Sequence, residues 1–262
     1  MAGRPPNATA SPRLWAWRLR RLTIAGAAAL AISSAPAAAQ VMPNTPAGAS
    51  TVGEGTKTDV AFTIAVQSDY VSRGISQSEG RPVLSGGVDA ARGIGYAGAF
   101  VSGVRYEGDP STRAEINLYA GIRPEWRALR FDLGVSASVY PGQPPDAGYD
   151  SLILYVGVSR EFGRLMVTGY VYYSPDSAGA DEGAATYVEA GPTFAVSPRL
   201  SVSAGVGHQQ SSSDRDHSTW HAGTMLAVAR KVTVELRYHN TTRADFGAEY
   251  RSRLVLTASA NF

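Results

Sequence analysis

The chain has 262 residues, of which 18% are charged and none is cysteine. The absence of cysteine excludes disulfide bonds and thiol chemistry. The formal net charge of +2 depends on residues 1–39, because removing them takes away five arginines and no acid, leaving 19 basic against 22 acidic residues and a net charge of −3. The basic balance of the full chain is therefore no reason to expect nucleic-acid binding.

The beginning of the chain has the pattern of an export signal. A basic stretch up to Arg21 is followed by an apolar run over 22–32 and by small residues up to Ala39. The apolar run is too short to cross a bilayer as a helix. We predict a signal peptide over 1–39, cleaved after Ala39, and export through the periplasm to the outer membrane of a Gram-negative bacterium.

The region that follows is predicted to be a flexible periplasmic lead-in over 40–58, because it is rich in Pro, Gly, Ala and Thr. From residue 59 to residue 262, apolar and polar residues alternate in most segments, which indicates β-strands with one apolar face. The predicted strands are twelve segments: 59–71, 82–91, 96–106, 113–125, 129–140, 149–161, 164–174, 185–197, 200–210, 217–230, 232–242 and 252–262.

The connections between these segments alternate between tight turns and longer loops rich in Gly, Pro, Asp and Ser. This alternation is typical of bacterial outer-membrane barrels, whose short turns and termini lie in the periplasm. A soluble sandwich also has alternating strands, but it has no reason to alternate short and long connections. The predicted fold is all-β: an antiparallel up-and-down transmembrane β-barrel of about twelve strands over 59–262. Pro192 predicts a bulge or a break in the eighth strand.

Aromatic residues mark the ends of the segments. The last segment stops at Phe262, and a terminal aromatic on an alternating strand resembles the insertion signal of bacterial outer-membrane proteins. We predict that Phe262 is an assembly signal for the barrel assembly machinery. Other aromatics near segment ends suit the membrane interface, or face the lumen instead: Tyr70, Tyr106, Tyr140, Tyr173, Trp220 and Tyr238.

A signature near the first loop carries a family resemblance. The sequence SDYVSRGISQS over 68–78, followed by Arg81-Pro82 and by GGVD over 86–89, resembles the opening signature of the TorF family, also known as the Gcw_chp proteins. The block EINLYAG over 115–121 is similar to a later part of that family. The resemblance implies an exported outer-membrane barrel regarded as a porin. It implies no particular substrate, cofactor or catalytic residue.

The alternation also predicts which side chains face the lumen. Even positions of the first segment are apolar, so Asp69 and Arg73 are predicted to point inward at the outer mouth, where opposite charges across a lumen create a transverse field. Alternatively, the two residues form an ion pair or cap the loop that begins at Gly74. The same rule gives the remaining pore-lining candidates: Asp89, Glu115, Arg123, Arg130, Asp132, Glu189, Glu235 and Arg237.

A lumen of mixed charge has two interpretations. It lines a water-filled channel for passive diffusion of ions or small hydrophilic solutes, or its charges pair across a narrow barrel and close it, as in a structural or adhesin-type barrel. The expected partners are outer-membrane lipid, lipopolysaccharide and small solutes. The predicted outer loops are acidic, but no spacing of aspartates matches a calcium loop, so we predict no metal and no cofactor.

A barrel hydrolase is the enzymatic alternative. His208, His217, His221 and His239 lie near the predicted outer ends of three neighbouring strands, and a histidine beside a serine activates a nucleophile. However, the sequence has no G-x-S-x-G motif, and His217 and His221 are about 13 Å apart on an extended strand, too far to share a metal. The sequence therefore favours a channel without enzymatic activity.

Overall fold

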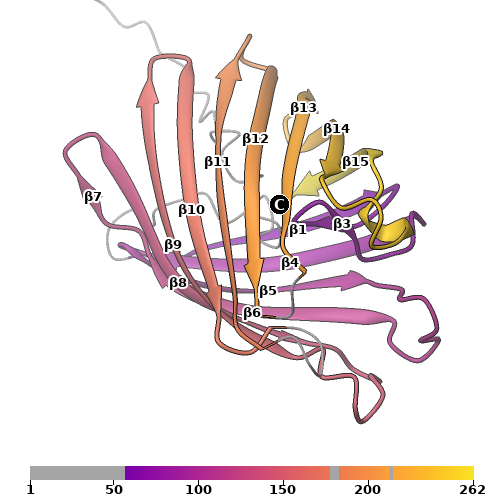
Figure 1. The fold of residues 1–262 in the computed structure, drawn as a ribbon. Helices are drawn as coiled ribbons and strands as arrows, with labels where there is room; N and C mark the ends of the chain where they lie inside the picture. The colour runs from indigo at the N-terminus through magenta and orange to yellow at the C-terminus, as the bar shows by residue number, and fades with distance from the viewer. Residues whose placement is uncertain (1–56, 178–182, 213–214) are drawn as a thin grey trace, which may run out of the picture. The chain divides into compact units, whose positions relative to one another are not determined.

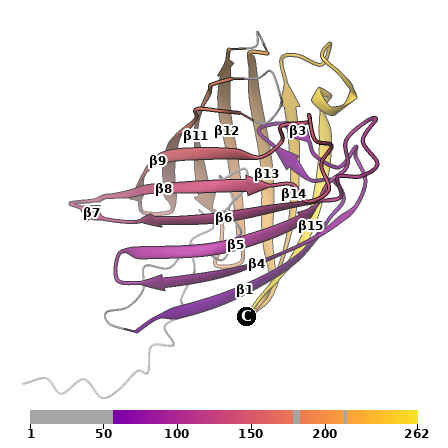
Figure 2. The same cartoon turned by 90° about the horizontal axis from the view of Figure 1, so that it is seen from below.

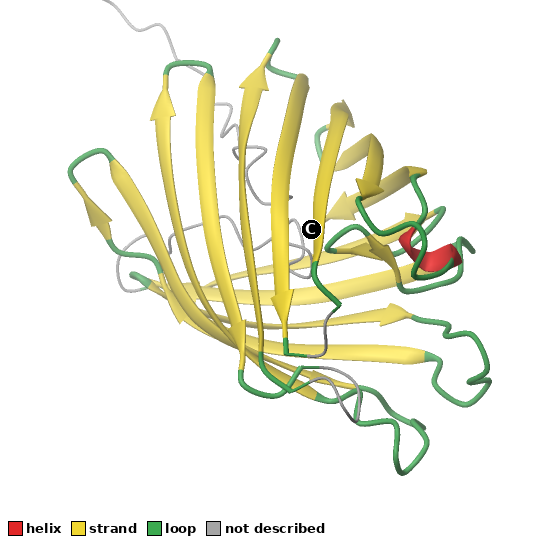
Figure 3. Cartoon of the chain, in the orientation of Figure 1, coloured by secondary structure: helices red, strands yellow, loops and turns green. Residues whose placement is uncertain are grey.

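The computed structural model describes residues 57–177, 183–212 and 215–262. The predicted signal peptide over 1–39 and most of the predicted lead-in lie outside these ranges. The described residues form one large antiparallel sheet, a small hairpin and a 3-10 helix, η2 (Ala248–Tyr250), drawn in red in Figure 3. Within these ranges, no helix is long and apolar enough to cross a membrane.

The large sheet is built from long strands that follow one another along the chain (Figure 1). Its twelve long strands, counted over the described residues, are β1 (Asp59–Gln67), β4 (Val83–Arg92), β5 (Gly95–Gly103), β6 (Ala114–Ile122), β8 (Leu129–Val139), β9 (Ser151–Phe162), β10 (Leu165–Ser174), β11 (Ala185–Ala195), β12 (Leu200–Ser211), β13 (His217–Ala229), β14 (Val232–Thr241) and β15 (Arg253–Asn261). Three two-residue strands complete the described structure: β2 (Val71–Ser72), β3 (Ile75–Ser76) and β7 (Glu125–Trp126).

The sheet closes into a barrel. Each long strand pairs with the next, β6 pairs with β8, and β1 pairs with β15. The last residue takes part in this closure, because Phe262 N donates to Phe62 O at 2.9 Å and Phe62 N donates to Phe262 O at 3.1 Å. A closed antiparallel sheet pairs its backbone groups between strands and leaves no open edge, which is the condition for crossing hydrocarbon with strands.

The structure confirms the predicted all-β class, the number of long strands and the alternation of short turns with long loops. Three strands end at least three residues earlier than predicted, among them the fourth, which is predicted to reach residue 125 whereas β6 ends at Ile122. The first predicted strand continues to residue 71, whereas β1 ends at Gln67, and the third continues to residue 106, whereas β5 ends at Gly103. In the first case the chain leaves the sheet to form the β2–β3 hairpin, which the alternation does not reveal.

The two faces of the barrel differ in polarity. On β1, Phe62 and Ile64 point outward and are 53% and 54% exposed. Thr63, which lies between these two residues, points inward and is 6% exposed. Exposed aromatics lie at both ends of the outer surface, as in the interface girdles of membrane barrels: Trp126, Phe162, Phe194 and Phe262 toward the short turns, and Tyr173 and Trp220 toward the loops. Tyr70 and Tyr140 are instead packed inside, with Tyr106 against them.

Contrary to the prediction, the strand neither bulges nor ends at Pro192. β11 continues through Pro192, which stays opposite Val167 of β10. Its pairing with β12 is interrupted at Gly191 and Pro192 and resumes in the same register at Thr193. A proline lacks one donor, and that donor would have served only one neighbouring strand. The irregularity that the structure does show is a bulge in β13 between Ala227 and Ala229.

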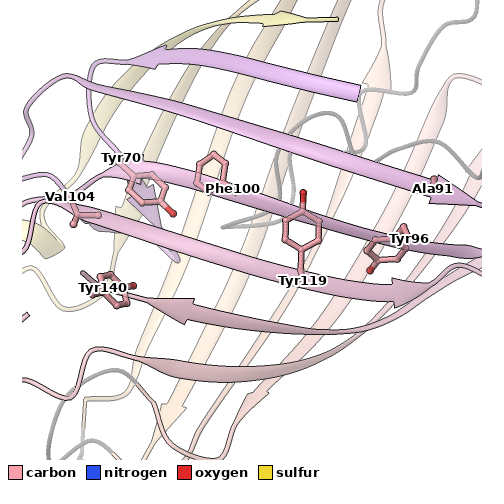
Figure 4. Packing of buried hydrophobic residues seen from close by; sticks show 7 residues of the cluster. All are labelled: Tyr70, Ala91, Tyr96, Phe100, Val104, Tyr119 and Tyr140. Carbon is pink, nitrogen blue, oxygen red and sulfur yellow. The ribbon is translucent and has the colours of Figure 1, made fainter. Parts of the chain in front are cut away.

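Two of the inner tyrosines, Tyr96 and Tyr119 (Figure 4), each lie opposite a glycine of the adjacent strand. Tyr119 is directly opposite Gly98, and Tyr96 is directly opposite Gly121. A Cβ atom at Gly121 would lie 2.6 Å from the Cζ atom of Tyr96, which is closer than side chains approach. The missing side chain therefore lets each ring lie along the wall, as in aromatic rescue of glycine in β-sheets.

Candidate functional site: the barrel interior and its inserted hairpin

The interior of the barrel contains most of the residues that the sequence predicts to line a pore. Those less than a tenth exposed are Asp69, Asp89, Glu115, Arg123, Asp132, Glu189 and Arg237. Arg73 and Glu235 are partly buried. Arg130 lies near the turn between β7 and β8, where its Nε atom is 3.0 Å from Glu125 Oε1 and its side chain is 36% exposed.

One interior cluster lies toward the short turns and is centred on Asp132. Its carboxylate accepts hydrogen bonds from Tyr96 at 2.6 Å, from Arg123 Nε at 3.2 Å and from Tyr170 at 3.3 Å. The guanidinium of Arg123 also lies 3.9 Å from the centre of the Tyr96 ring. Beside this cluster, the Tyr119 hydroxyl donates to Asp89. Arg123 and Asp132 form an ion pair within this hydrogen-bonded network, whereas the Oδ2 atom of Asp89 is buried without a hydrogen-bond partner in the described structure.

A second cluster is centred on Arg237 of β14, which is six strands from β8 around the barrel. Its guanidinium donates to Glu235 and to Ser203 Oγ, the latter at 2.9 Å, and it lies beside the His221 ring. His221 Nε2 is 3.8 Å from Glu189 Oε2, and Glu189 accepts from the Tyr187 hydroxyl at 2.7 Å. Charges of both signs therefore alternate along the wall.

The loop after β1 folds into the barrel as a hairpin whose base is fixed by Asp69. The carboxylate of Asp69 accepts from Ser76 Oγ at 2.7 Å and Ser78 Oγ at 2.8 Å, and from Arg253 Nη1 of β15 at 2.6 Å. The predicted alternative of an Asp69–Arg73 ion pair is therefore wrong, because the ion pair of Asp69 is with Arg253. The local spacing could not show this partner, which is 184 positions away in sequence.

The tip of this hairpin reaches the far wall. β2 pairs with β3 through a two-residue turn of Arg73 and Gly74, with φ of +48° and +80°, the geometry of a type I′ turn. Arg73 lies 5.6 Å from the ring centre of Tyr172 on β10, and β10 is six strands from β1 around the twelve-stranded ring. The hairpin therefore crosses the interior (β3 in Figure 2).

Several contacts hold the tip in place. Arg73 Nη1 donates to Gln209 Oε1 at 3.2 Å, and its guanidinium lies 5.3 Å from the Tyr187 ring centre. At Gly74, an added Cβ would lie 2.8 Å from Thr241 Cγ2 and 2.9 Å from Thr219 Cγ2. A positive φ in a non-glycine residue costs on the order of 1–3 kcal/mol and persists where surrounding contacts fix it. The strained Arg73 is thus held by the opposite wall.

Burial affects the protonation of the groups around the hairpin. Desolvation lowers the pKa of the Arg73 guanidinium from its ordinary value, while the nearby Tyr187 and Tyr172 oppose this change. Burial raises the pKa of Tyr106 and of Tyr140 above the ordinary phenol value. Both phenols therefore keep their protons at neutral pH and remain able to donate hydrogen bonds.

A cavity of about 250 Å³ lies between the hairpin and the loop ends of the strands. Its lining includes Arg73 and Gln77 from the hairpin region, Tyr140 and Tyr149 from the β8–β9 loop, and Gln209 at the end of β12. Tyr106, Tyr140 and Tyr149 contact one another with ring centres 5.1–6.2 Å apart. The cavity is therefore a polar vestibule with an aromatic wall.

The four histidines do not form a metal site. Over residues 57–177, 183–212 and 215–262, no group of three or more His, Cys, Asp or Glu could hold a metal ion. His221 lies beside His239, with ring centres 5.8 Å apart. His208 Nδ1 contacts Ser218 Oγ at 3.0 Å at an exposed position.

Sequence reasoning missed several interior residues. Arg253 fixes the hairpin base, and Tyr172 and Tyr187 receive its tip. The alternation of β10 and β11 places both tyrosines on the inner face, so the strand pattern could have identified their side of the sheet. Their contact with Arg73 depends on the path of the loop and has no local signal.

Comparison with known proteins identifies the family of this fold and site. The family described as "Bacterial protein of unknown function (Gcw_chp)" matches residues 52–260, about four-fifths of the chain. The chain belongs to the Gcw_chp family. The family resemblance of the loop signature is thereby confirmed, and the hairpin that crosses the interior is formed by this signature. No curated protein matches the sequence.

Solved structures support the fold of this Gcw_chp protein. An outer membrane channel from Pseudomonas putida F1 has 11% identity, a TM-score of 0.55, and coverage of 83% of this chain and 99% of that one. The KdgM porin has 8% identity, a TM-score of 0.54, and coverage of 79% and 99%. The NanC porin has 8% identity, a TM-score of 0.52, and coverage of 78% and 99%. The fold is therefore that of outer-membrane β-barrels.

Proposed function

We propose that this protein is an outer-membrane channel for passive diffusion of ions and small hydrophilic solutes, narrowed by the hairpin of its first loop. The observation that carries the proposal is the contrast between the apolar outer surface and the charged interior of a closed barrel. Charged side chains such as Arg123, Asp132 and Glu189 need water or partners, and a wall of mixed charge supports weak selectivity.

The placement in the membrane follows from the same contrast. The short turns and the C-terminus lie at one end of the barrel, and the long loops lie at the other. We assign the turn end to the periplasm, with export directed by residues 1–39, and the loop end to the lipopolysaccharide surface. Insertion requires the barrel assembly machinery, which reads the final strand and Phe262.

The test is the conductance of the refolded mature protein in planar lipid bilayers in concentrated salt. Reproducible unitary current steps, with a reversal potential that depends on the salt gradient, are expected for an open channel. A folded barrel, shown by heat-modifiable migration, that never conducts would overturn the proposal and favour the closed structural or adhesin-type barrel.

The proposal includes no catalysis. The nearest arrangement to a hydrolytic pair is His208 and Ser218, in contact across neighbouring strands. The test is phospholipid hydrolysis by the refolded wild type beside Ser218→Ala. We expect no release of fatty acid from either, whereas release that disappears in Ser218→Ala would establish a hydrolase and contradict a pure channel.

A further inference from the structure

The lining of the loop-end cavity differs in charge from the rest of the interior. Among residues 57–177, 183–212 and 215–262, its lining includes Arg73 and His217 and no aspartate or glutamate. Elsewhere in the interior, acids such as Asp132 and Glu189 are part of the wall. Within the described part of the chain, the vestibule is thus a region where a solute with a negative charge would meet the guanidinium of Arg73 and no carboxylate of the lining.

Several acids of the loop end accept hydrogen bonds from their neighbours, among them Asp216, which lies between the lining residues Arg215 and His217 and accepts from the backbone N of Ser211 at 2.7 Å. Asp109 accepts from Ser111 Oγ at 2.6 Å, and Asp150 accepts from the backbone N of Tyr140 at 2.8 Å. Glu115 accepts from Asn117 Nδ2 at 2.9 Å. These hydrogen bonds occupy the carboxylates, and Glu115 is buried in the wall, so the described lining of the cavity consists of neutral and cationic groups.

The Arg73 guanidinium has more N–H donors than the one hydrogen bond to Gln209 uses. In the described part of the chain, its guanidinium contacts Gln209 and two tyrosine rings and has no carboxylate within ion-pair distance. A guanidinium has five N–H donors in a planar fork that fits a carboxylate. The carboxylates of Glu189 and Glu115 act on Arg73 only from beyond ion-pair distance. A bound anion in direct contact would therefore offset more of the desolvation that lowers the pKa of this partly buried guanidinium.

The rest of the lining suits a hydroxylated molecule. Gln209 has an amide and Ser151 a hydroxyl in the lining, and Tyr106 and Tyr149 contribute aromatic rings. The Tyr106 hydroxyl donates to Gln77 Oε1 at 3.1 Å. A volume of about 250 Å³ holds on the order of eight water molecules at about 30 Å³ each, which is the space of one sugar ring. Aromatic faces beside hydrogen-bonding groups are a common lining of small-molecule sites.

We propose that the loop-end cavity binds a small hydroxylated carboxylate, of the size of a single sugar ring, with Arg73 holding the carboxylate. This proposal rests on the channel function and gives that channel an anion-binding step at its outer mouth. The hairpin then has two roles, because the residue that anchors its tip to the far wall is also the residue that meets the solute.

The test compares two solutes that differ in one group. Isothermal titration calorimetry on the refolded mature protein in detergent uses sodium D-glucuronate and D-glucose, which share the ring and differ in the carboxylate. We expect glucuronate to bind at least about tenfold more tightly, as a hydrogen-bonded charge pair allows, and to bind more weakly at high salt. Equal affinities, or no binding of glucuronate, would overturn the proposal.

Variants locate the site. Arg73→Gln is expected to remove the preference for glucuronate, whereas Arg251→Gln, an exposed arginine outside the lining, is expected to keep it. A preference that survives in folded Arg73→Gln would overturn the role of Arg73, and if this variant does not refold, the wild-type comparison of the two sugars still decides.

Conductance separates the two proposals: a silent barrel that prefers glucuronate contradicts only the channel, and a conducting barrel without preference contradicts only the binding site.

Discussion

Asp69 and Arg253 form an ion pair across the first and last strands of the barrel, with 2.6 Å between Asp69 Oδ2 and Arg253 Nη1. Their side chains are 6% and 13% exposed, so solvent screens the pair weakly. The same carboxylate holds Ser76 and Ser78 of the hairpin region. The pair therefore fixes the base of the hairpin at the point where the barrel closes.

Breaking this pair is expected to loosen the hairpin while the barrel stays folded. Arg253→Met leaves Asp69 buried without its counter-ion, which typically costs about 3–5 kcal/mol, and detachment of the hairpin relieves that cost by exposing Asp69 to water. We expect larger and noisier unitary conductance. The control is Arg251→Met, an exposed arginine two positions away. Wild-type conductance in folded Arg253→Met would show that the pair does not hold the hairpin.

The tip of the hairpin offers a matched pair of glycine variants. Gly74 and Gly80 both have positive φ, but only at Gly74 would a Cβ meet other side chains, those of Thr219 and Thr241. Both alanine variants carry the backbone strain, about 1 kcal/mol, and only Gly74→Ala adds the steric conflict. We expect increased conductance in Gly74→Ala and unchanged conductance in Gly80→Ala. Equal effects in both would attribute the change to strain alone.

The charges of the hairpin are expected to influence ion selectivity. Removing the cation in Arg73→Ala should shift the reversal potential toward cation preference, and removing the anion in Asp69→Ala should shift it the other way, because Arg253 then lacks its partner. Insertion should be unaffected in both. Unchanged reversal potentials in both variants would exclude these two residues from the conduction path.

The strand pattern of this chain is predictable because one physical rule governs every strand. Val60, Phe62 and Ile64 face outward as their alternation with polar residues predicts, and one period-two rule gives the inner side of Glu115 and Asp132 as well. The prediction about Pro192 used a local rule, that proline disfavours strands because it lacks a backbone N–H donor. The rule fails here because that donor would pair with only one of the two neighbouring strands.

The hairpin is not predictable from the same rule. The sequence around Arg73 and Gly74 is polar and reads as an ordinary outer loop, and its inward path depends on Arg253, Tyr172 and Tyr187, all at least 99 positions away from Arg73. Such contacts have no periodic signature. The loop signature over 68–78 therefore forms a hairpin whose contacts are with residues far away in the sequence.

The tyrosine–glycine contacts make a prediction about stability. In Gly98→Ala, the new Cβ would lie 2.5 Å from Tyr119 Cζ, and overpacking of this kind typically costs about 1–3 kcal/mol. In Gly169→Ala, the nearest atoms lie 3.8–3.9 Å away, and we expect little change or a slight gain. Urea unfolding of the refolded barrel in lipid vesicles checks this difference. Equal stabilities would show that the Tyr119 ring moves freely away from the wall.

The last residue closes the barrel, and its removal is expected to impair assembly. Deleting Phe262 removes two backbone hydrogen bonds to Phe62 and the terminal aromatic that we propose as the signal for the assembly machinery. The control is Phe194→Ala, which removes another exposed aromatic at the turn end without touching the closing pair of strands. Heat-modifiable protein in the outer membrane should fall several-fold in the deletion and stay near the wild-type level in the control. A wild-type level in the deletion would show that β15 pairs and is recognised without Phe262, and an equal loss in both would assign the effect to aromatic anchoring in general.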